Sequence, residues 1–144
     1  MVIRRETVTR RLEELDQVVQ ELSLYKSLTK AELRTDLSQR WIVERGLIAA
    51  AALVLDTSNH ILSGHFGYYT ETYEESLLAL RDKDVISDVL YQQIKGLGGF
   101  RNVLVHLYQD IDPILVWEYL QKGLTVFPSF SQQVLAWLDA LEPD

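Results

Sequence analysis

The chain has 144 residues, a length typical of one domain, so we predict a single domain over residues 1–144. It contains no cysteine, which excludes disulfides, thiolate metal sites and a cysteine nucleophile. The net charge of −7 argues against a broad, nonspecific nucleic-acid surface. Residues 1–45 nevertheless carry nine Lys or Arg against eight Asp or Glu, and the remainder carries five against thirteen. Any RNA contact must therefore be local, and the acidic remainder would suit a basic protein partner.

Neither the N-terminus nor the longest apolar run predicts a membrane segment. The N-terminal "MVIRRETVTRRLEELDQ" is charged from the start and lacks the apolar core of a signal peptide. The longest apolar run, "LIAAAALVL", has nine residues, whereas a membrane-spanning helix needs roughly 20. We therefore expect this run to be a buried helix of a cytoplasmic protein that has no membrane contact.

Apolar residues recur with helical spacing along almost the whole chain. In the first segment they follow a 4-3-4-3 rhythm that forms one seam of an amphipathic helix, at Val8, Leu12, Leu15, Val19 and Leu22. Thr29 and Glu32 have the spacing of a capping box, which predicts a helix start. We expect this second helical region to break near residues 37–38 and to end near residue 62.

The stretch "SGHFGYYTETYEE" predicts a loop, and Thr72 with Glu75 repeats the capping-box spacing. A short helix should follow to about Asp82. The next helix should be long, beginning within residues 84–87 and continuing through "GGFRNVLVHLY".

Asp112 followed by Pro113 predicts another helix start, with Asp as the N-cap and Pro in the first turn. We expect this helix to be short and closed by Gly123, and a last helix to cover about residues 127–141. Strand signals are almost absent. The sequence therefore predicts an all-α antiparallel bundle of five or six helices, four of which form the core.

The stretch "GGFRNVLVHLYQDID" places four polar side chains within eight positions of one predicted helix. When residues 86–108 are wound at 100° per residue, Arg101 falls inside the apolar arc, and Asn102 and His106 lie on the opposite face, one turn apart. A permanent cation on an apolar stripe is costly unless it finds a carboxylate, a phosphate or an exit to water. Arg101 is the one break in the pattern of this helix.

Two readings of these residues remain open from spacing alone. In the first, Arg101 extends its head to solvent and His106 is a favourable charge near a helix C-terminus. In the second they form a ribonuclease site, because histidine carries protons near neutral pH and arginine matches phosphate oxygens. On an ideal helix the two side chains point about 140° apart, so a shared site requires a distorted helix end or a two-fold related copy.

The residues "RNVLVHLY" fit an R-x4-6-H pattern extended by x-Y, and this pattern resembles the HEPN superfamily. The version ending in H-x-Y is similar to the HepT branch, toxins of bacterial toxin–antitoxin pairs. The likeness extends over roughly residues 38–122, including "RWIVERGLIAAAALVLDTSNHIL" and "FGYYTETYEESLLALRDKDVIS". A HEPN-like fold is therefore expected.

The resemblance implies an all-helical homodimer with a metal-independent endoribonuclease site at the subunit interface and no cofactor. Arg101 and His106 would be the catalytic pair, and Asn102 would occupy the polar position of the motif. Tyr108 would be the phenol that a partner antitoxin, a minimal nucleotidyltransferase, modifies with AMP in a type VII toxin–antitoxin module. RNA would be the substrate, cleaved by its own 2′-hydroxyl.

Other residues have weaker claims to a site. His60 and His65 lack an evident third metal ligand, so we predict no metal site. Glu44 either pairs with Arg101 and touches the site or forms a surface ion pair. The acidic group Glu71, Glu74 and Glu75 predicts a solvated helix start.

Core packing is expected for the three tryptophans Trp41, Trp117 and Trp137. The glycines of "GLGGF" follow a helical pattern and predict close approach of another helix, from this subunit or a second one.

Two rival functions remain. The chain could be a noncatalytic HEPN adaptor whose cleft holds nucleotide for a nucleotidyltransferase. It could also be a helical oligomerisation module in which the Arg101 head merely reaches solvent.

Overall fold

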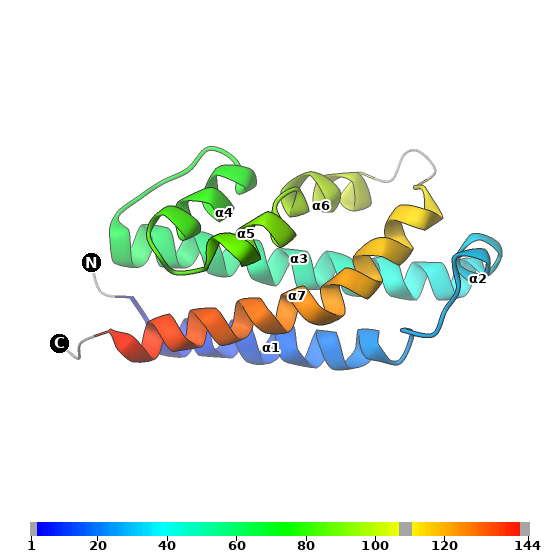
Figure 1. Cartoon of the computed structure of the whole chain (residues 1–144), viewed down its shortest axis with the longest axis horizontal. Helices are drawn as coiled ribbons and strands as arrows, with labels where there is room; N and C mark the ends of the chain where they lie inside the picture. Colours follow the sequence, from blue (N-terminus) through cyan, green and yellow to red (C-terminus); the bar gives the residue numbers. More distant parts are fainter. Residues whose placement is uncertain (1–2, 107–110, 142–144) are drawn as a thin grey trace.

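The computed structural model describes residues 3–106 and 111–141. Within these ranges the chain forms helices and no strand. Seven helices follow one another: α1 (Arg5–Ser23), α2 (Lys30–Thr35), α3 (Leu37–Phe66), α4 (Tyr73–Asp82), α5 (Asp88–Ile94), α6 (Leu97–Val105) and α7 (Pro113–Ala140) (Figure 1). The predicted all-α bundle is confirmed.

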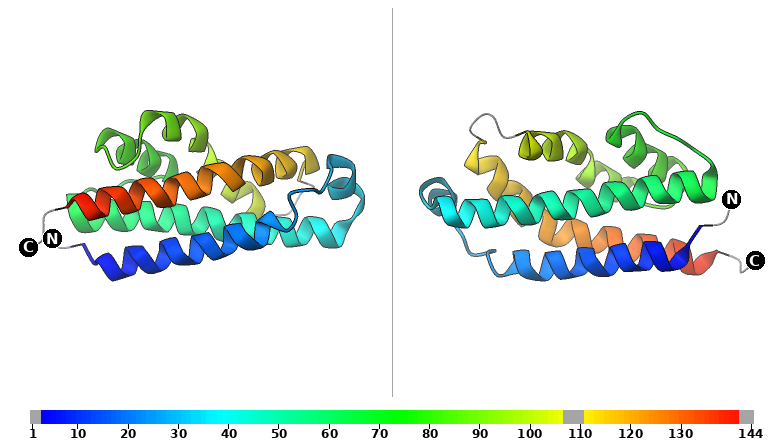
Figure 2. Two further views of the ribbon diagram at one scale, coloured as in Figure 1. Left: turned by 60° about the horizontal axis from the view of Figure 1, so that its bottom comes forward. Right: turned by 180° about the vertical axis from the view of Figure 1, so that it is seen from behind.

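Three long helices form the body of the molecule. Helix α3 lies at the centre and packs against both α1 and α7, which also pack against each other. The N- and C-terminal ends of the described chain lie at the same end of this bundle (Figure 2). The predicted seam of α1 is buried at Val8, Leu12, Leu15 and Leu22. These contacts make α1, α3 and α7 three members of the predicted four-helix core.

Helix α3 is long and apolar enough to cross a membrane by length and composition alone. Half of its most apolar window is buried within the protein, and alanines and leucines of the predicted buried run contribute to the core. The apolar residues of α3 are therefore explained by its position at the centre of the bundle, where they pack against the other helices.

The place of a fourth long helix is taken by the short helices α4, α5 and α6, which lie together along one side of α3 (Figures 1 and 2). Helices α4 and α6 both pack on α3, whereas α5 packs on α4 and α7. This layer carries the residues that the sequence identified as a possible site.

The helix starts predicted from capping residues are confirmed. Thr29 and Glu32 form a complete capping box at α2. The Thr72 side chain accepts the backbone N–H of Glu75 at the start of α4. The side chain of Asp112 accepts the N–H of Ile114, and Pro113 is the first residue of α7. Local hydrogen-bond chemistry thus determines where these helices begin.

The predicted long helix from residues 84–87 to Tyr108 was wrong. It is divided into α5 and α6 at Lys95 and Gly96, where Lys95 has an extended backbone with ψ 143° and Gly96 has φ 92°. A left-handed φ is available to glycine at little cost, so Gly96 permits the chain to turn between two helices. Helix α6 also ends earlier than predicted, because His106 leaves the helical conformation.

The predicted division between a short helix ending at Gly123 and a last helix from residue 127 was also wrong, because α7 is continuous. A Cβ on Gly123 would lie 2.6 Å from a ring carbon of Phe127, so the glycine makes room for that ring and does not end the helix. Pro128 lies inside α7. Burial of Phe127 and Phe130 on either side of Pro128 outweighs the lost backbone hydrogen bond.

The three tryptophans differ from the prediction in one case. Trp117 and Trp137 are partly buried against the core, as expected. Trp41 is 60% exposed, because it lies on the face of α3 that neither α1 nor α7 covers. Its neighbour Ile42 is 47% exposed. The start of α3 therefore presents an apolar surface to solvent.

Candidate functional site

Helix α6 is fixed by its apolar face. Leu97, Phe100 and Leu104 recur at helical spacing and are all buried. The Phe100 ring stacks on the Tyr119 ring of α7, with centroids 3.6 Å apart and planes 4° from parallel. Burial, followed by the charges of Glu74 and Glu118, raises the pKa of Tyr119. This packing fixes the rotation of α6 about its axis and so decides where its polar residues point.

A carboxylate from another helix holds the beginning of α6. Glu74 accepts the backbone N–H of Gly96 and that of Gly98, each at 2.9 Å. Gly96 has no side chain to cap the helix, so Glu74 satisfies amides that would otherwise lack partners. A negative charge at a helix N-terminus is also electrostatically favourable. Glu74 lies in the first turn of α4, as predicted, but it is half-buried and links α4 to α6 instead of being only solvated.

Close approach between α4 and α6 requires Gly98. A Cβ on Gly98 would lie 2.9 Å from the Tyr73 Cβ and 3.1 Å from a Glu74 carboxylate oxygen. Gly99 differs, because no atom lies within 4 Å of its Cβ position. The predicted close helix approach is confirmed at Gly98, with α4 of the same chain as the neighbour.

Arg101 extends from α6 onto the face of an aromatic ring. Its guanidinium carbon lies 5.6 Å from the centroid of the Tyr73 ring, within the range of a cation–π interaction. Its Nε is buried and has no hydrogen-bond partner among the described residues. The cation is therefore held partly out of water with donor capacity available for an anion.

Glu44 does not form an ion pair with Arg101 among the described residues. Its carboxylate lies 3.5 Å from the Nε of Arg40, one turn earlier on α3. The expected ion pair thus exists, but Glu44 is buried rather than at the surface. Burial raises the pKa of the Glu44 carboxyl, and the Arg40 guanidinium partly opposes this.

Asn102 and His106 occupy the end of α6. Both are exposed, and the backbone N–H of His106 donates to the carbonyl of Asn102 at 3.0 Å. His106 has φ −96° and ψ 52°, so the helical conformation ends at this residue. Tyr108 lies outside the described residues.

A cleft of about 600 Å³ opens between the start of α4 and α6. It is lined by Asn59, Thr70, Glu71, Thr72, Tyr73, Glu74, Gly98, Gly99 and Asn102. Sequence reasoning placed Asn102 at the site but missed Asn59 and Tyr73, which come from other helices. No local spacing could have joined them, because they meet Asn102 only through the packing of α3, α4 and α6.

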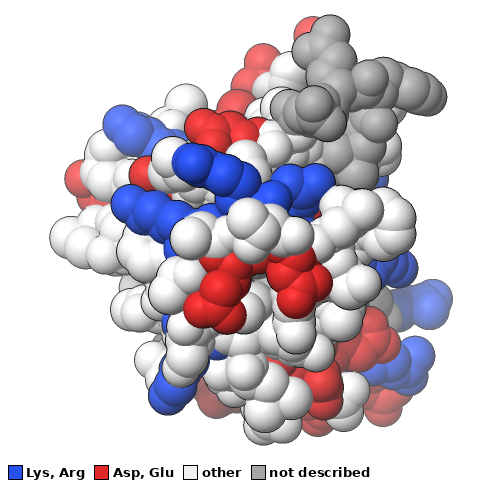
Figure 3. Space-filling view, turned by 90° about the vertical axis from the view of Figure 1, so that its right-hand side faces the viewer, with Lys and Arg blue, Asp and Glu red and all other residues white. Residues whose placement is uncertain are grey.

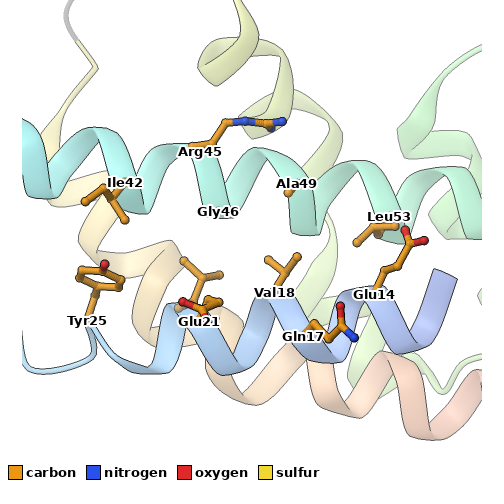
Figure 4. Close-up of a pocket in the computed structure, with 11 residues that line it drawn as sticks. Glu14, Gln17, Val18, Glu21, Tyr25, Ile42, Arg45, Gly46, Ala49 and Leu53 are labelled. Carbon is orange, nitrogen blue, oxygen red and sulfur yellow. The ribbon is translucent and has the colours of Figure 1, made fainter. Parts of the chain in front are cut away.

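A second groove, of about 670 Å³, lies between α1 and α3 (Figure 4). Tyr25 and Ile42 face each other at one end of it, and Glu14 and Leu53 meet at the other (Figure 4). Gly46 permits this approach of the two helices, since a Cβ there would lie 2.6 Å from Leu22. The groove holds none of the predicted site residues.

The two other histidines do not form a metal site. The His65 ring makes edge contacts with Phe66 and Trp137, whereas His60 lies near Arg11 and Arg4 of the first segment. Burial, followed by these two cations, lowers the pKa of His60. Over residues 3–106 and 111–141, no group of three His, Asp or Glu side chains could hold a metal ion.

Comparison with known proteins identifies the family of the chain. The family model described as "Ribonuclease HepT-like" matches residues 10–134, which is most of the chain and includes the whole of α6. The chain belongs to the HepT-like family. The predicted resemblance is therefore confirmed.

Two curated relatives are similar over nearly the whole chain. The HepT-like chain is 28% identical to a protein of Aphanizomenon flos-aquae named "tRNA nuclease HepT", over 93% of this chain and 91% of that protein. It is 26% identical to a "Putative RNase" of Archaeoglobus fulgidus, over 93% of this chain and 97% of that protein.

Solved structures share the HepT-like fold. A Shewanella oneidensis HEPN toxin, described as tri-AMPylated and in complex with an MNT antitoxin, matches with a TM-score of 0.81 at 19% identity, over 92% of this chain and 99% of that one. YutE of Bacillus subtilis, described as a cytosolic protein of unknown function, matches with a TM-score of 0.81 at 21% identity, over 100% of this chain and 98% of that one. The HEPN-like fold prediction is confirmed.

Proposed function

We propose that this chain is an endoribonuclease toxin of a type VII toxin–antitoxin pair, with Arg101 and His106 as its catalytic residues. Membership of the HepT-like family supports ribonuclease activity, as do the relatives named as a tRNA nuclease and a putative RNase. The observation that carries the proposal is the guanidinium of Arg101. It lies on the Tyr73 ring, and its buried Nε has no hydrogen-bond partner among residues 3–106 and 111–141. The helix that carries it ends at His106.

The proposed reaction is transesterification without a metal ion or cofactor. His106 accepts the proton of a ribose 2′-hydroxyl, and the 2′-oxygen attacks the adjacent phosphorus. The bond from phosphorus to the 5′-oxygen of the next nucleotide breaks, and that oxygen takes up a proton from water, while His106 gives its proton back to the solvent. The products are a 2′,3′-cyclic phosphate and a free 5′-hydroxyl. Arg101 binds the phosphate oxygens and stabilises the negative charge that grows on them, while Asn102 orients the substrate.

A homodimer would complete the site. The start of α3 and the end of α6, two helices that pack on each other, carry the large exposed apolar residues Leu37, Trp41, Ile42, Val103 and Val105. The groove between α1 and α3 continues this surface, since Ile42 also lines the groove. Exposed apolar area of this kind is typical of an interaction surface. A second copy bound here would bring a second Arg101 and His106 towards the first pair.

The distribution of charge supports a local RNA contact. Lys and Arg side chains form a band across the end of the molecule where α2 lies, with acidic side chains beside it (Figure 3). Lys30 and Arg34 of α2 and Arg40 at the start of α3 belong to this region of the chain. The C-terminal end of α6 points towards the same end (Figure 1). RNA phosphates can therefore be attracted near His106 despite the net charge of −7.

Tyr108 is the proposed site of inhibition. A nucleotidyltransferase antitoxin would transfer AMP from ATP to the phenol oxygen and release pyrophosphate. Each AMP adds a negative phosphate and a bulky nucleoside two residues after His106, which repels and obstructs RNA. The HEPN toxin of Shewanella oneidensis, described as tri-AMPylated and bound to an MNT antitoxin, supports this assignment through its similar fold. We place the pair in the cytosol, where RNA and ATP are both present.

The decisive experiment compares wild type with an Arg101→Ala, His106→Ala double variant. Purified proteins are incubated with RNA in excess chelator, and the products are resolved on a denaturing gel. Wild type should produce fragments that end in a cyclic phosphate, and the double variant should produce none. Arg10→Ala, at an exposed position on α1, is the matched control and should cleave like wild type. Equal RNA loss from wild type and the double variant would exclude this site.

Growth distinguishes the toxin from a noncatalytic adaptor. Expression without the antitoxin should stop growth, and His106→Ala should relieve the arrest. Harmless expression of soluble wild type would favour the adaptor. Failure of an active cognate antitoxin to modify Tyr108 would favour a plain oligomerisation module.

The dimer can be tested separately. Trp41→Glu places a charge on the exposed apolar surface and should convert the dimer to a monomer in light scattering, with loss of cleavage. A dimer that persists in this variant would place the subunit interface elsewhere.

A further inference from the structure

We propose that the cleft between α4 and α6 binds one unpaired nucleobase of the RNA, next to the scissile phosphate, and that Glu71 makes it prefer guanine over uracil. This inference rests on the proposed ribonuclease function and adds a specificity-determining site to it. The starting observation is the cleft of about 600 Å³ that the proposed catalytic steps leave unused.

The charge of the cleft indicates which part of a nucleotide it can accept. Two carboxylates, those of Glu71 and Glu74, line it, and no Lys or Arg is among its described lining residues. A phosphate would be repelled by the carboxylates and would have no cation to bind there. A neutral base that offers N–H donors would instead find acceptors.

The wall contributed by α6 is suited to a flat ring. Gly98 and Gly99 line the cleft without side chains, and no atom lies within 4 Å of the Cβ position of Gly99. A planar base can therefore approach the backbone of α6 at this point. Tyr73 also lines the cleft, and stacking on aromatic rings is a common way to bind bases of single-stranded RNA.

The polar groups of the cleft differ in what they can still bind. The Glu74 carboxylate is already occupied by the amides of Gly96 and Gly98. The Asn59 Oδ1 accepts the hydroxyl of Ser76, so its amide N–H groups remain as donors. The Glu71 carboxylate is exposed and makes no side-chain hydrogen bond or ion pair within the described part of the chain. Glu71 is therefore the free acceptor and Asn59 the free donor.

Guanine matches this arrangement best. Its Watson–Crick edge carries two adjacent N–H donors that fit the two oxygens of one carboxylate, and its neighbouring O6 accepts from an amide. The corresponding edge of uracil has one N–H between two carbonyl oxygens, which a carboxylate would repel. Discrimination between these two bases therefore falls to Glu71.

The cleft is correctly placed for a base beside the reacting phosphate. Asn102 lines it. His106 lies one helical turn after Asn102, and its backbone N–H donates to the Asn102 carbonyl. Tyr73 lines the cleft, and its ring contacts the guanidinium of Arg101. A nucleotide whose base enters the cleft thus has its sugar and phosphate close to both proposed catalytic residues.

The first test is cleavage of RNA oligonucleotides that differ only by guanine or uracil at one position. Wild type should cut next to guanine about tenfold faster, the size expected for one bidentate contact at an exposed position. Glu71→Gln replaces one acceptor with a donor and should reduce this ratio to about threefold or less. The control Glu13→Gln changes an exposed glutamate of α1 that lines neither cavity and should keep the wild-type ratio. An unchanged ratio in Glu71→Gln, or no base preference in wild type, would overturn the proposal.

The second test measures binding without cleavage. Guanosine and uridine are titrated into the Arg101→Ala, His106→Ala variant, and the amide NMR signals of Gly98, Gly99 and Asn102 are followed. Guanosine should shift them with at least about fivefold higher affinity than uridine, and Glu71→Gln in the same background should remove the difference. Equal effects of the two nucleosides would contradict selective binding of guanine in the cleft.

The two tests separate failure of the cleft from failure of the ribonuclease. If wild type does not cleave RNA but the double variant binds guanosine selectively, the proposed function fails and the cleft stands. If wild type cleaves RNA and neither test shows base selectivity, the proposed ribonuclease function is supported and the proposal of a guanine site in the cleft fails.

Discussion

Helices α1, α3 and α7 have 19, 30 and 28 residues, whereas α4, α5 and α6 have only 10, 7 and 9. The long helices are joined by a continuous apolar core that includes Leu12, Leu47 and Phe130. The short helices also contribute to this core, but they are linked to one another by particular polar contacts as well, such as the bonds from Glu74 to α6. Isolated helices shorter than about 12–15 residues are marginal in water, so each short helix needs such support.

This difference indicates how the molecule divides its tasks. The long helices supply stability through burial, which depends on volume and is insensitive to the position of any one polar atom. The short helices hold the candidate site, where the position of individual atoms decides the chemistry. Four predictions test this division, and they are given from the largest expected effect to the smallest.

The largest loss of stability is expected from Phe130→Ala in α7. Phe130 is fully buried, and truncation of a buried phenylalanine typically costs about 3–5 kcal/mol. Urea denaturation followed by circular dichroism should show this reduction in the free energy of unfolding. RNA cleavage below the transition should remain near the wild-type rate. A specific loss of cleavage in the folded variant would mean that the core and the site are not separate.

Gly98→Ala and Gly99→Ala form a matched pair one residue apart on α6. A Cβ at Gly98 would meet the Tyr73 Cβ at 2.9 Å, so Gly98→Ala should destabilise the protein by about 1–3 kcal/mol. Gly99→Ala has open space and should be neutral or stabilising by up to about 1 kcal/mol, because alanine favours helix. Thermal unfolding should separate the two variants in opposite directions. Equal effects would contradict the packing of α4 on α6.

Glu74→Gln weakens the link between α4 and α6 but keeps one acceptor oxygen. We expect a loss of about 1 kcal/mol, typical of a helix cap, together with faster amide exchange of Gly96 and Gly98. RNA cleavage should fall through a lower kcat, because α6 positions Arg101. The matched variant Glu75→Gln alters a carboxylate near the same helix start that, within the described part of the chain, accepts the Glu71 amide and no amide of α6. Comparable exchange at Gly96 and Gly98 in both variants would show that Glu74 has no special role.

The smallest effect concerns the pH dependence of stability through His60. Because its folded pKa is lowered from 6.5, the unfolded chain binds the proton more readily than the folded chain. The free energy of unfolding should therefore fall as the pH decreases from above 6.5 through the folded pKa. His60→Gln should remove this part of the decrease. Urea denaturation of both proteins at pH 7.5 and 5.5 checks it, and parallel decreases would show that His60 does not contribute.

The bundle and the motif on α6 were largely predictable from the sequence, because their signals are local. The spacing of Leu12 and Leu15 defines a buried seam, and the caps at Thr29 and Asp112 define helix starts by hydrogen bonds over a few residues. The pattern from Arg101 to His106 led to the family that the comparison confirmed. Each of these features can be read within one or two helical turns.

The support of the candidate site was not predictable, because it joins residues that are distant in sequence. Nothing near Glu74 indicates that its carboxylate binds amides 22 and 24 residues later. The place of Arg101 on the Tyr73 ring likewise depends on how α6 packs on α4. Trp41 has the spacing of a core residue, yet its face of α3 remains uncovered within this one chain. Tertiary packing decides all three cases.

The link from Glu74 to α6 has a consequence for protein engineering. Tyr73, Glu74, Gly98, Arg101 and Asn102 all fall within the contiguous segment 73–105. A chimera that exchanges this segment between two family members would transfer one wall of the cleft together with the hydrogen bonds from Glu74 to α6. The recipient would need an aromatic residue at the place of Tyr119, on which the transplanted Phe100 can stack, and apolar faces on α3 and α7 that fit the transplanted helices. Extending the exchange to residue 71 would carry Glu71, the proposed specificity residue, together with this wall of the cleft.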